Sequence, residues 1–235
     1  MNEIARKLAI FALPVLIGIT FHEVAHGLVA RSMGDDTAER MGRLSLNPVR
    51  HIDPLGTIVL PLLLLVFGSG IIFGYARPVP VNPSRFRNVK RGMVLVSAAG
   101  PGSNLAIALL SGLLFRLIAW AFPAVAAKVI RAGIFANPSG GVEFLLVPIA
   151  LMLAVSVQFN VLLFIFNLIP IPPLDGGRIV AGLLPPGLDA RFSAVEKYGM
   201  VILLLLLFID PFGIMSRLFG YLMVGLSTII LGITV

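Results

Sequence analysis

The chain has 235 residues, of which 58% are hydrophobic and 12% are charged, and its formal net charge is +7. A soluble domain carries about twice this share of charged residues, so the composition excludes an ordinary soluble protein and indicates a membrane protein. The basic residues cluster in short loops between apolar runs, where they orient a membrane protein, so the charge predicts no nucleic-acid partner.

Six apolar runs follow one another, at roughly 8–30, 55–74, 92–122, 142–169, 195–209 and 212–235. A spanning helix needs about 20 apolar residues, so the first, third, fourth and last runs are long enough. The run 195–209 is short, and 55–74 carries Pro61 and Gly68-Ser69-Gly70, which suit a broken or re-entrant segment. The pattern predicts an all-α polytopic membrane protein, a helical bundle of about five to six membrane segments in a single domain over residues 1–235.

The first apolar run contains the stretch "ITFHEVAHGLVA", residues 19–30. His22 and His26 are four residues apart, so a helix places both on one face, with Glu23 beside them. This matches the H-E-x-x-H pattern, in which both histidines bind zinc and the glutamate is a general base. The alternative is a polar helix end at the membrane surface. Because an ionisable group inside a bilayer is costly and marks a functional site, the metal site is favoured.

A catalytic zinc ion usually has three protein ligands and one water, so a third ligand is needed. The chain has no cysteine, and the candidates are therefore His51, Asp53, Glu143, Asp175 and Asp189. Asp175 lies in "NLIPIPPLDGGR", residues 167–178, directly after an apolar helix. The prolines end that helix, and the two glycines after Asp175 allow a close backbone turn. An ordinary Asp-Gly turn is the alternative, but the missing ligand and the position at membrane depth favour Asp175.

These two motifs together resemble the site-2 protease family of intramembrane zinc metalloproteases. The family combines H-E-x-x-H with a later N-x-x-P-x-P-x-x-D-G-G-like motif, here HEVAH and NLIPIPPLDGG. The segment "SAAGPGSNLAIAL", residues 97–109, resembles the G-P-x-x-N region of the family. The resemblance covers a catalytic core of about residues 8–180, followed by C-terminal helices at about 195–235, and the chain lacks a PDZ or CBS domain.

The resemblance implies one Zn²⁺ ion per chain, with His22, His26 and Asp175 as ligands and Glu23 as the catalytic base. It also implies that Asn104 and Asn167 bind substrate. The partners it implies are a membrane protein or peptide substrate and the lipid bilayer, and the location it implies is the membrane of a prokaryotic cell.

Membrane topology provides a test of the metal site, because the ligands must converge within about 2 Å of one ion and so lie at one depth. The helices that carry HEVAH and precede Asp175 must then cross the membrane in the same direction. This requires 55–74 to enter and leave on one side. The basic loop 75–91 marks that side as cytoplasmic, so we expect the active site to open to the cytoplasm.

Two polar stretches, "GRLSLNP" at 42–48 and "ARPVPVNP" at 76–83, have an extended rather than a helical pattern. They are either plain connecting loops or a small β-hairpin or sheet near the active site. The edge of such a sheet could bind an unwound substrate by strand addition. Asn160 and Asn167 share a helix face, where polar residues also act as ordinary contacts between helices.

Two other functions use intramembrane histidines and acids. A metal-ion or proton transporter needs a polar relay through the far leaflet, where the helices offer little beyond Ser111 and Arg116. A catalytically inactive membrane scaffold is disfavoured because the base and all three ligands are present. The sequence therefore predicts a zinc metalloendopeptidase acting inside or at the edge of the bilayer.

Overall fold

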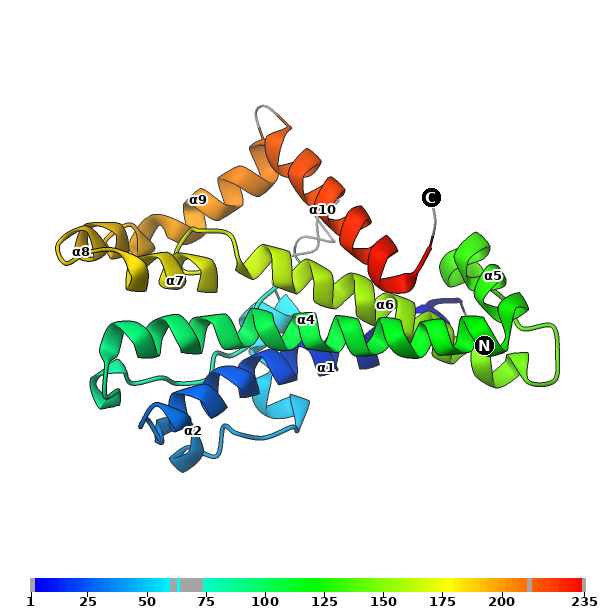
Figure 1. Cartoon of the computed structure of the whole chain (residues 1–235), viewed down its shortest axis with the longest axis horizontal. Helices are drawn as coiled ribbons and strands as arrows, with labels where there is room; N and C mark the ends of the chain where they lie inside the picture. The colour runs from blue at the N-terminus through cyan, green and yellow to red at the C-terminus, as the bar shows by residue number, and fades with distance from the viewer. Residues whose placement is uncertain (1–2, 60–62, 64–73, 211–212, 234–235) are drawn as a thin grey trace.

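The computed structural model describes residues 3–59, 63, 74–210 and 213–233, and these residues are mostly helical (Figure 1). The α-helices are α1 (Glu3–Ser32), α2 (Thr37–Arg40), α4 (Val89–Ala121), α5 (Pro123–Ala132), α6 (Glu143–Asn167), α7 (Asp175–Leu183), α8 (Leu188–Ser193), α9 (Glu196–Ile209) and α10 (Ile214–Leu231). Short turns of other helix types are η1 (Pro48–His51), η2 (Pro54–Val59), η3 (Pro83–Arg85) and η4 (Gly133–Phe135).

Three long apolar helices form the centre of the molecule. α1 from Leu8, α4 and α6 are each long and apolar enough to cross a membrane. α4 packs against both α1 and α6, and α1 also packs against α6. The prediction of a helical integral membrane protein is therefore confirmed.

The expected number of membrane segments is not supported. α9 has 14 residues, which at 1.5 Å per residue reach about 21 Å, less than the hydrocarbon core of about 30 Å. The apolar part of α10, Ser216–Leu231, is also too short by the same criterion. In the described part of the chain, three helices qualify as spans rather than five to six.

The small β-hairpin or sheet is wrong for the two stretches predicted to form it. Both 42–48 and 76–83 are described, and neither contains a strand. Prolines at 78, 80 and 83 remove backbone N–H donors from the second stretch, so it cannot form a regular ladder. The carbonyls of Arg77 and Pro78 accept hydrogen bonds from the Arg43 side chain instead.

The re-entrant prediction for 55–74 falls on residues 60–62 and 64–73, which lie outside the described residues. Before them, η2 begins at Pro54. After them, the backbone N–H of Tyr75 donates to the carbonyl of Gly56. The two described ends of this segment therefore lie together.

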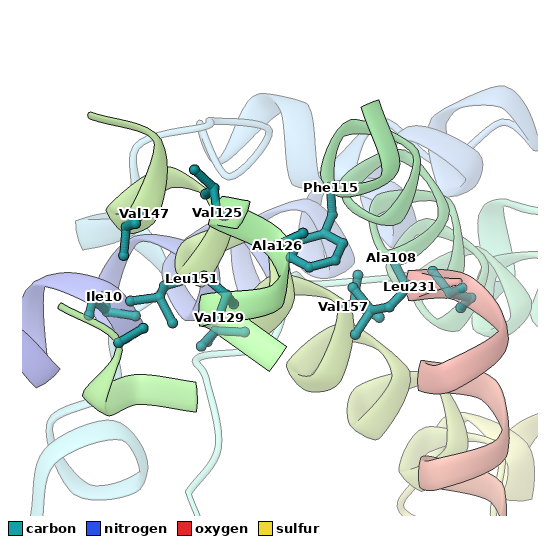
Figure 2. Packing of buried hydrophobic residues seen from close by; sticks show 14 of the residues in the cluster. Ile10, Ala108, Phe115, Val125, Ala126, Val129, Val147, Leu151, Val157 and Leu231 are labelled. Atoms are coloured by element: carbon teal, nitrogen blue, oxygen red, sulfur yellow. The ribbon is translucent and has the colours of Figure 1, made fainter. Parts of the chain in front are cut away.

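The hydrophobic core lies toward the end of the bundle that holds α5 and the start of α1 (Figure 2). Its buried members come from α1, α4, α5, α6 and α10 and from the loop after η4: Ile10, Ala108, Phe115, Val125, Ala126, Val129, Ala136, Val147, Ala150, Leu151, Val155, Val157, Val161, Ile165, Ile230 and Leu231. Arg6 donates to the carbonyl of Ile134 and fastens the start of α1 at this end. α2, α7 and α8 lie at the opposite end of the bundle (Figure 1).

Candidate metal centre

His22 and His26 lie side by side on α1, as their spacing of one helical turn requires. Their Nε2 atoms are 3.0 Å apart, and the two rings meet edge to face. Both side chains are largely buried, at 10% and 12% exposed. Both therefore direct the same ring nitrogen to one point inside the protein.

Asp175, the first residue of α7, is the third member of this cluster. Its Oδ2 lies 3.2 Å from Nε2 of His22 and 3.3 Å from Nε2 of His26. Burial acts to raise the pKa of the Asp175 carboxyl, but the neighbouring histidines outweigh it and hold that pKa at about 2. Asp175 is therefore a buried carboxylate facing two imidazoles.

The glycines around the cluster are required by close approaches. A Cβ atom on Gly176 would lie 2.4 Å from the carbonyl oxygen of Leu168, in the chain that leaves α6. On α4, a Cβ atom on Gly100 would lie 2.4 Å from Nε2 of His26 and 2.6 Å from Cε1 of His22. Gly100 thus lets α4 approach the two histidines, and Gly176 lets the start of α7 approach the chain that leaves α6.

The hydrogen bonds behind the two histidines determine which ring nitrogens carry protons. Nδ1 of His26 lies 2.7 Å from the carbonyl of Val96, which can only accept. Nδ1 of His22 lies 2.7 Å from Oδ1 of Asn104. The amide nitrogen of Asn104 donates to Gly18 and Asn160, so its oxygen is also the acceptor. When neutral, either ring therefore carries its proton on Nδ1 and presents a bare Nε2 to the cluster.

This arrangement fits a bound cation. Two bare Nε2 atoms and a carboxylate oxygen bring their lone pairs together, with all three ligand atoms within 4.8 Å of one another. Oδ2 of Asp175 is buried and has no hydrogen-bond partner among the described residues. With both rings neutral, the facing lone pairs repel one another unless a proton or a metal cation lies between them. Two imidazoles and one carboxylate form a donor set of catalytic zinc sites.

Glu23 follows His22 in α1 and is not part of the cluster of ligands. Its Oε2 accepts a hydrogen bond of 2.7 Å from the backbone N–H of Val79, in the extended segment before η3. The side chain is partly exposed, so it can reach water. Sequence reasoning missed the contact with Val79, because no local pattern connects residues 56 positions apart.

Asn104 lies directly behind the metal cluster and is fully buried. It touches His22 through its oxygen, and it donates to Oδ1 of Asn160 over 2.9 Å and to the carbonyl of Gly18 over 3.1 Å. Asn160 in turn donates to the carbonyl of Ser156. The sequence could predict that Asn160 lies on the α6 face, but it could not predict the link of Asn160, through Asn104, to a candidate metal ligand.

Asn167 is the last residue of α6, eight positions before Asp175. Its side chain is partly buried, and its amide donates to the carbonyl of Leu163, one turn earlier. It thus lies at the start of the loop that carries Asp175.

The other candidate ligands lie elsewhere. His51 is buried and bonds the carbonyl of Ser45 through Nε2, and Asp53 caps the backbone of Leu55 and Gly56. Glu143 pairs with Lys128, at 2.5 Å, on the far side of the bundle. Asp189 pairs with Lys90, and this contact holds the pKa of its carboxyl below the ordinary value. Among the described residues, Asp175 is the candidate that joins the two histidines.

Known proteins match this chain along most of its length. The family described as Peptidase family M50 matches residues 10–209. A protein of Bacillus subtilis (strain 168) named as a zinc metalloprotease, YwhC, is 42% identical over 200 residues, covering 85% of this chain and 80% of the relative. Rip2 of Mycobacterium tuberculosis (strain H37Rv), also named as a zinc metalloprotease, is 30% identical over 210 residues, covering 87% and 70%. No solved structure matches significantly.

The chain therefore belongs to peptidase family M50, and the resemblance to the site-2 protease family is confirmed. It is a membrane-embedded metallopeptidase. Neither the described structure nor these relatives support the transporter alternative.

Proposed function

We propose that this member of peptidase family M50 hydrolyses peptide bonds of membrane-spanning or membrane-proximal substrates, with one zinc ion held by His22, His26 and Asp175. The observation that carries the proposal is the convergence of two bare Nε2 atoms and one buried carboxylate beside Glu23. The names of the bacterial relatives support zinc as the metal.

A zinc ion held by His22, His26 and Asp175 would lower the pKa of a bound water molecule and polarise the substrate carbonyl. Glu23 takes the proton of the attacking water on a carboxylate oxygen as the new C–O bond forms. It then gives that proton to the leaving amine as the C–N bond breaks. The N–H of Val79 donates to Oε2 of Glu23. The other carboxylate oxygen, Oε1, is therefore the one that carries the proton.

For the two asparagines we propose different roles. All the hydrogen-bonding groups of the Asn104 side chain are engaged by His22, Asn160 and Gly18, which supports a role in orienting His22 rather than contacting substrate. Asn167 remains the proposed substrate-binding residue, because its place at the end of α6 is beside the loop that leads to Asp175.

We propose that the active site opens to the cytoplasm of a prokaryotic cell, where the lipid bilayer and a membrane protein substrate are its partners. α2, α7 and α8 lie at the same end of the bundle (Figure 1), which supports a common side for their loops. Arg85, Arg87 and Arg91 lie at the connection into α4 and favour the cytoplasmic side.

The test is cleavage by the purified full chain in detergent or nanodiscs, using a membrane-spanning model peptide and mass spectrometry of the products. We expect cleavage that a zinc chelator abolishes and added zinc restores, and cleavage at least about 10²-fold slower from Glu23→Gln. Cleavage that continues after complete metal removal would contradict the proposal.

A further inference from the structure

Arg43 is a buried arginine that lies close to the candidate active site without touching the metal ligands. It follows α2 in the loop toward η1 and is 9% exposed. Its guanidinium donates to three backbone carbonyls: Arg50 at 2.5 Å, Arg77 at 2.7 Å and Pro78 at 3.3 Å. Among the described residues, Arg43 forms no ion pair with a carboxylate. The three backbone carbonyls therefore stabilise the positive charge of its guanidinium.

Two of these carbonyls belong to the extended segment that contacts Glu23. The next residue after Pro78 is Val79, whose N–H donates to Oε2 of Glu23 over 2.7 Å. Pro78 itself has no N–H, and prolines at 78 and 80 prevent this segment from forming a helix. The segment is therefore held by partners outside it. The N–H of Arg77 donates to the carbonyl of His51, and the N–H of Asn82 donates to Asp35. Arg43 binds the two carbonyls next to Val79.

The segment that contains Val79 packs closely against α1. A Cβ atom on Gly27, one turn after Glu23, would lie 2.3 Å from Cδ2 of Leu44 and 3.1 Å from Cγ1 of Val79. The residue next to Arg43 and the residue next to Pro78 thus rest on the same glycine of α1. Arg43 joins its own loop to the segment before Val79 through its hydrogen bonds to the carbonyls of Arg77 and Pro78.

We propose that Arg43 is a positioning residue for Glu23: it fixes the carbonyls of residues 77 and 78 so that the N–H of Val79 holds the carboxylate beside the metal. This inference rests on the proposed role of Glu23 as the base. A fixed carboxylate matters because a displacement of about 1 Å in a reacting group can lower a rate by about 10²-fold.

An arginine suits this position better than other cations. Its planar fork reaches carbonyls of two segments at once, which a lysine ammonium on a single flexible stem cannot reproduce. Burial lowers the pKa of Arg43, and Arg77 and Arg50 lower it further, while the nearby Glu23 carboxylate opposes this change. The guanidinium nevertheless remains charged, because arginine is protonated at all physiological pH values.

The test compares Arg43→Met and Arg43→Lys with a matched control, Arg50→Met. Arg50 lies in the same loop and also donates to a backbone carbonyl, that of Gly42, but it does not touch the extended segment. For each purified full-length variant, zinc content, kcat and KM for a model peptide, and hydrogen exchange of the backbone at 77–81 are measured.

We expect Arg43→Met to keep stoichiometric zinc and a KM within about 3-fold of wild type, while kcat falls about 10-fold or more and exchange at Val79 accelerates. Arg43→Lys should lie between, and Arg50→Met should match wild type. Unchanged kcat in zinc-loaded Arg43→Met, a change in KM alone, or an equal loss in Arg50→Met would each overturn the proposal. If Arg43→Met does not fold, Arg43→Lys decides by the same criteria.

A double-variant comparison tests the route through Glu23. Glu23→Asp withdraws the carboxylate by one methylene and so loses the contact with Val79. Adding Arg43→Met to Glu23→Asp should then lower kcat by less than about 3-fold, since both changes remove one interaction. If the kcat losses of the two single variants instead multiply in the double variant, Arg43 acts through a residue other than Glu23. The exchange measurement needs no turnover, so it separates failure of this inference from failure of the proposed peptidase mechanism.

Discussion

The side-chain oxygen of Asn104 lies 2.7 Å from Nδ1 of His22, inside the membrane-spanning bundle. Asn104 is fully buried and is itself held by Oδ1 of Asn160, at 2.9 Å. A Cβ atom on Gly18 would lie 2.9 Å from that same Asn160 oxygen, so α1 needs a glycine there to admit the pair. The orientation of a proposed metal ligand on α1 thus depends on α4 and α6.

Replacing Asn104 by leucine should weaken zinc binding by about 10- to 100-fold, because a metal-bound histidine then loses the acceptor for its second ring nitrogen. Competition with a chelator of known affinity measures the dissociation constant. The matched control is Ser111→Ala, which removes a buried hydrogen bond to Ser156 on the same helix pair but touches no ligand. Wild-type zinc affinity in Asn104→Leu would return Asn104 to a role in substrate binding.

Replacing Asp175 by alanine should abolish stoichiometric zinc and with it the peptidase activity, because two histidines alone hold the ion weakly. Asp189→Ala serves as the control, since Asp189 pairs with Lys90 outside the cluster. Metal analysis of the purified proteins gives the answer directly. Full zinc content in Asp175→Ala would remove this residue from the ligand set.

Glu23→Gln should keep zinc but lower kcat by about 10²-fold or more, because glutamine keeps the shape of the side chain and cannot accept the proton. Its side-chain oxygen can still accept the hydrogen bond from Val79. Steady-state cleavage of the model peptide, with zinc measured in the same samples, checks this outcome. Turnover near the wild-type value would require a different base.

Gly100→Ala should displace the two histidines and reduce zinc occupancy, because the added Cβ atom would lie 2.4 Å from Nε2 of His26. Alanine is otherwise the better residue in a helix, by about 1 kcal/mol, so a loss cannot come from helix propensity. Gly102→Ala is the control on the same helix, where nothing lies within 4 Å of the new atom. Equal zinc occupancy in both variants would contradict the close packing of α4 on the ligands.

Single cysteines at Leu46, Arg87 and Arg191 should react with a membrane-impermeant thiol reagent from the same side of the membrane, and a cysteine at Phe135 from the other. All four positions are exposed, and the wild-type chain has no cysteine. The expectation follows from the proposed metal centre, because α1, which carries the two histidines, and α6, which leads to Asp175, must end at one depth. Labelling of positions 46 and 87 from opposite sides would make the segment at 55–74 a full span.

The sequence alone led to much of the metal centre. The spacing of His22 and His26 follows the helical period, so one turn of α1 places them together whatever surrounds it. Asp175 could be selected because the prolines before it end a helix, the glycines after it allow a close backbone turn, and a zinc site needs a third ligand. The helical membrane class followed from the length of apolar runs, which depends only on the thickness of the bilayer.

Other features depended on where distant segments meet. A buried asparagine on a spanning helix has no sequence signal that tells a neighbour of His22 from an ordinary contact between helices, so the role proposed for Asn104 came from the packing of α4 against α1. The extended pattern at 76–83 suggested a sheet, yet its carbonyls bind Arg43 and its Val79 N–H binds Glu23. Loops have no periodicity that encodes their path, and the partners of their backbone groups are therefore decided by the tertiary structure alone.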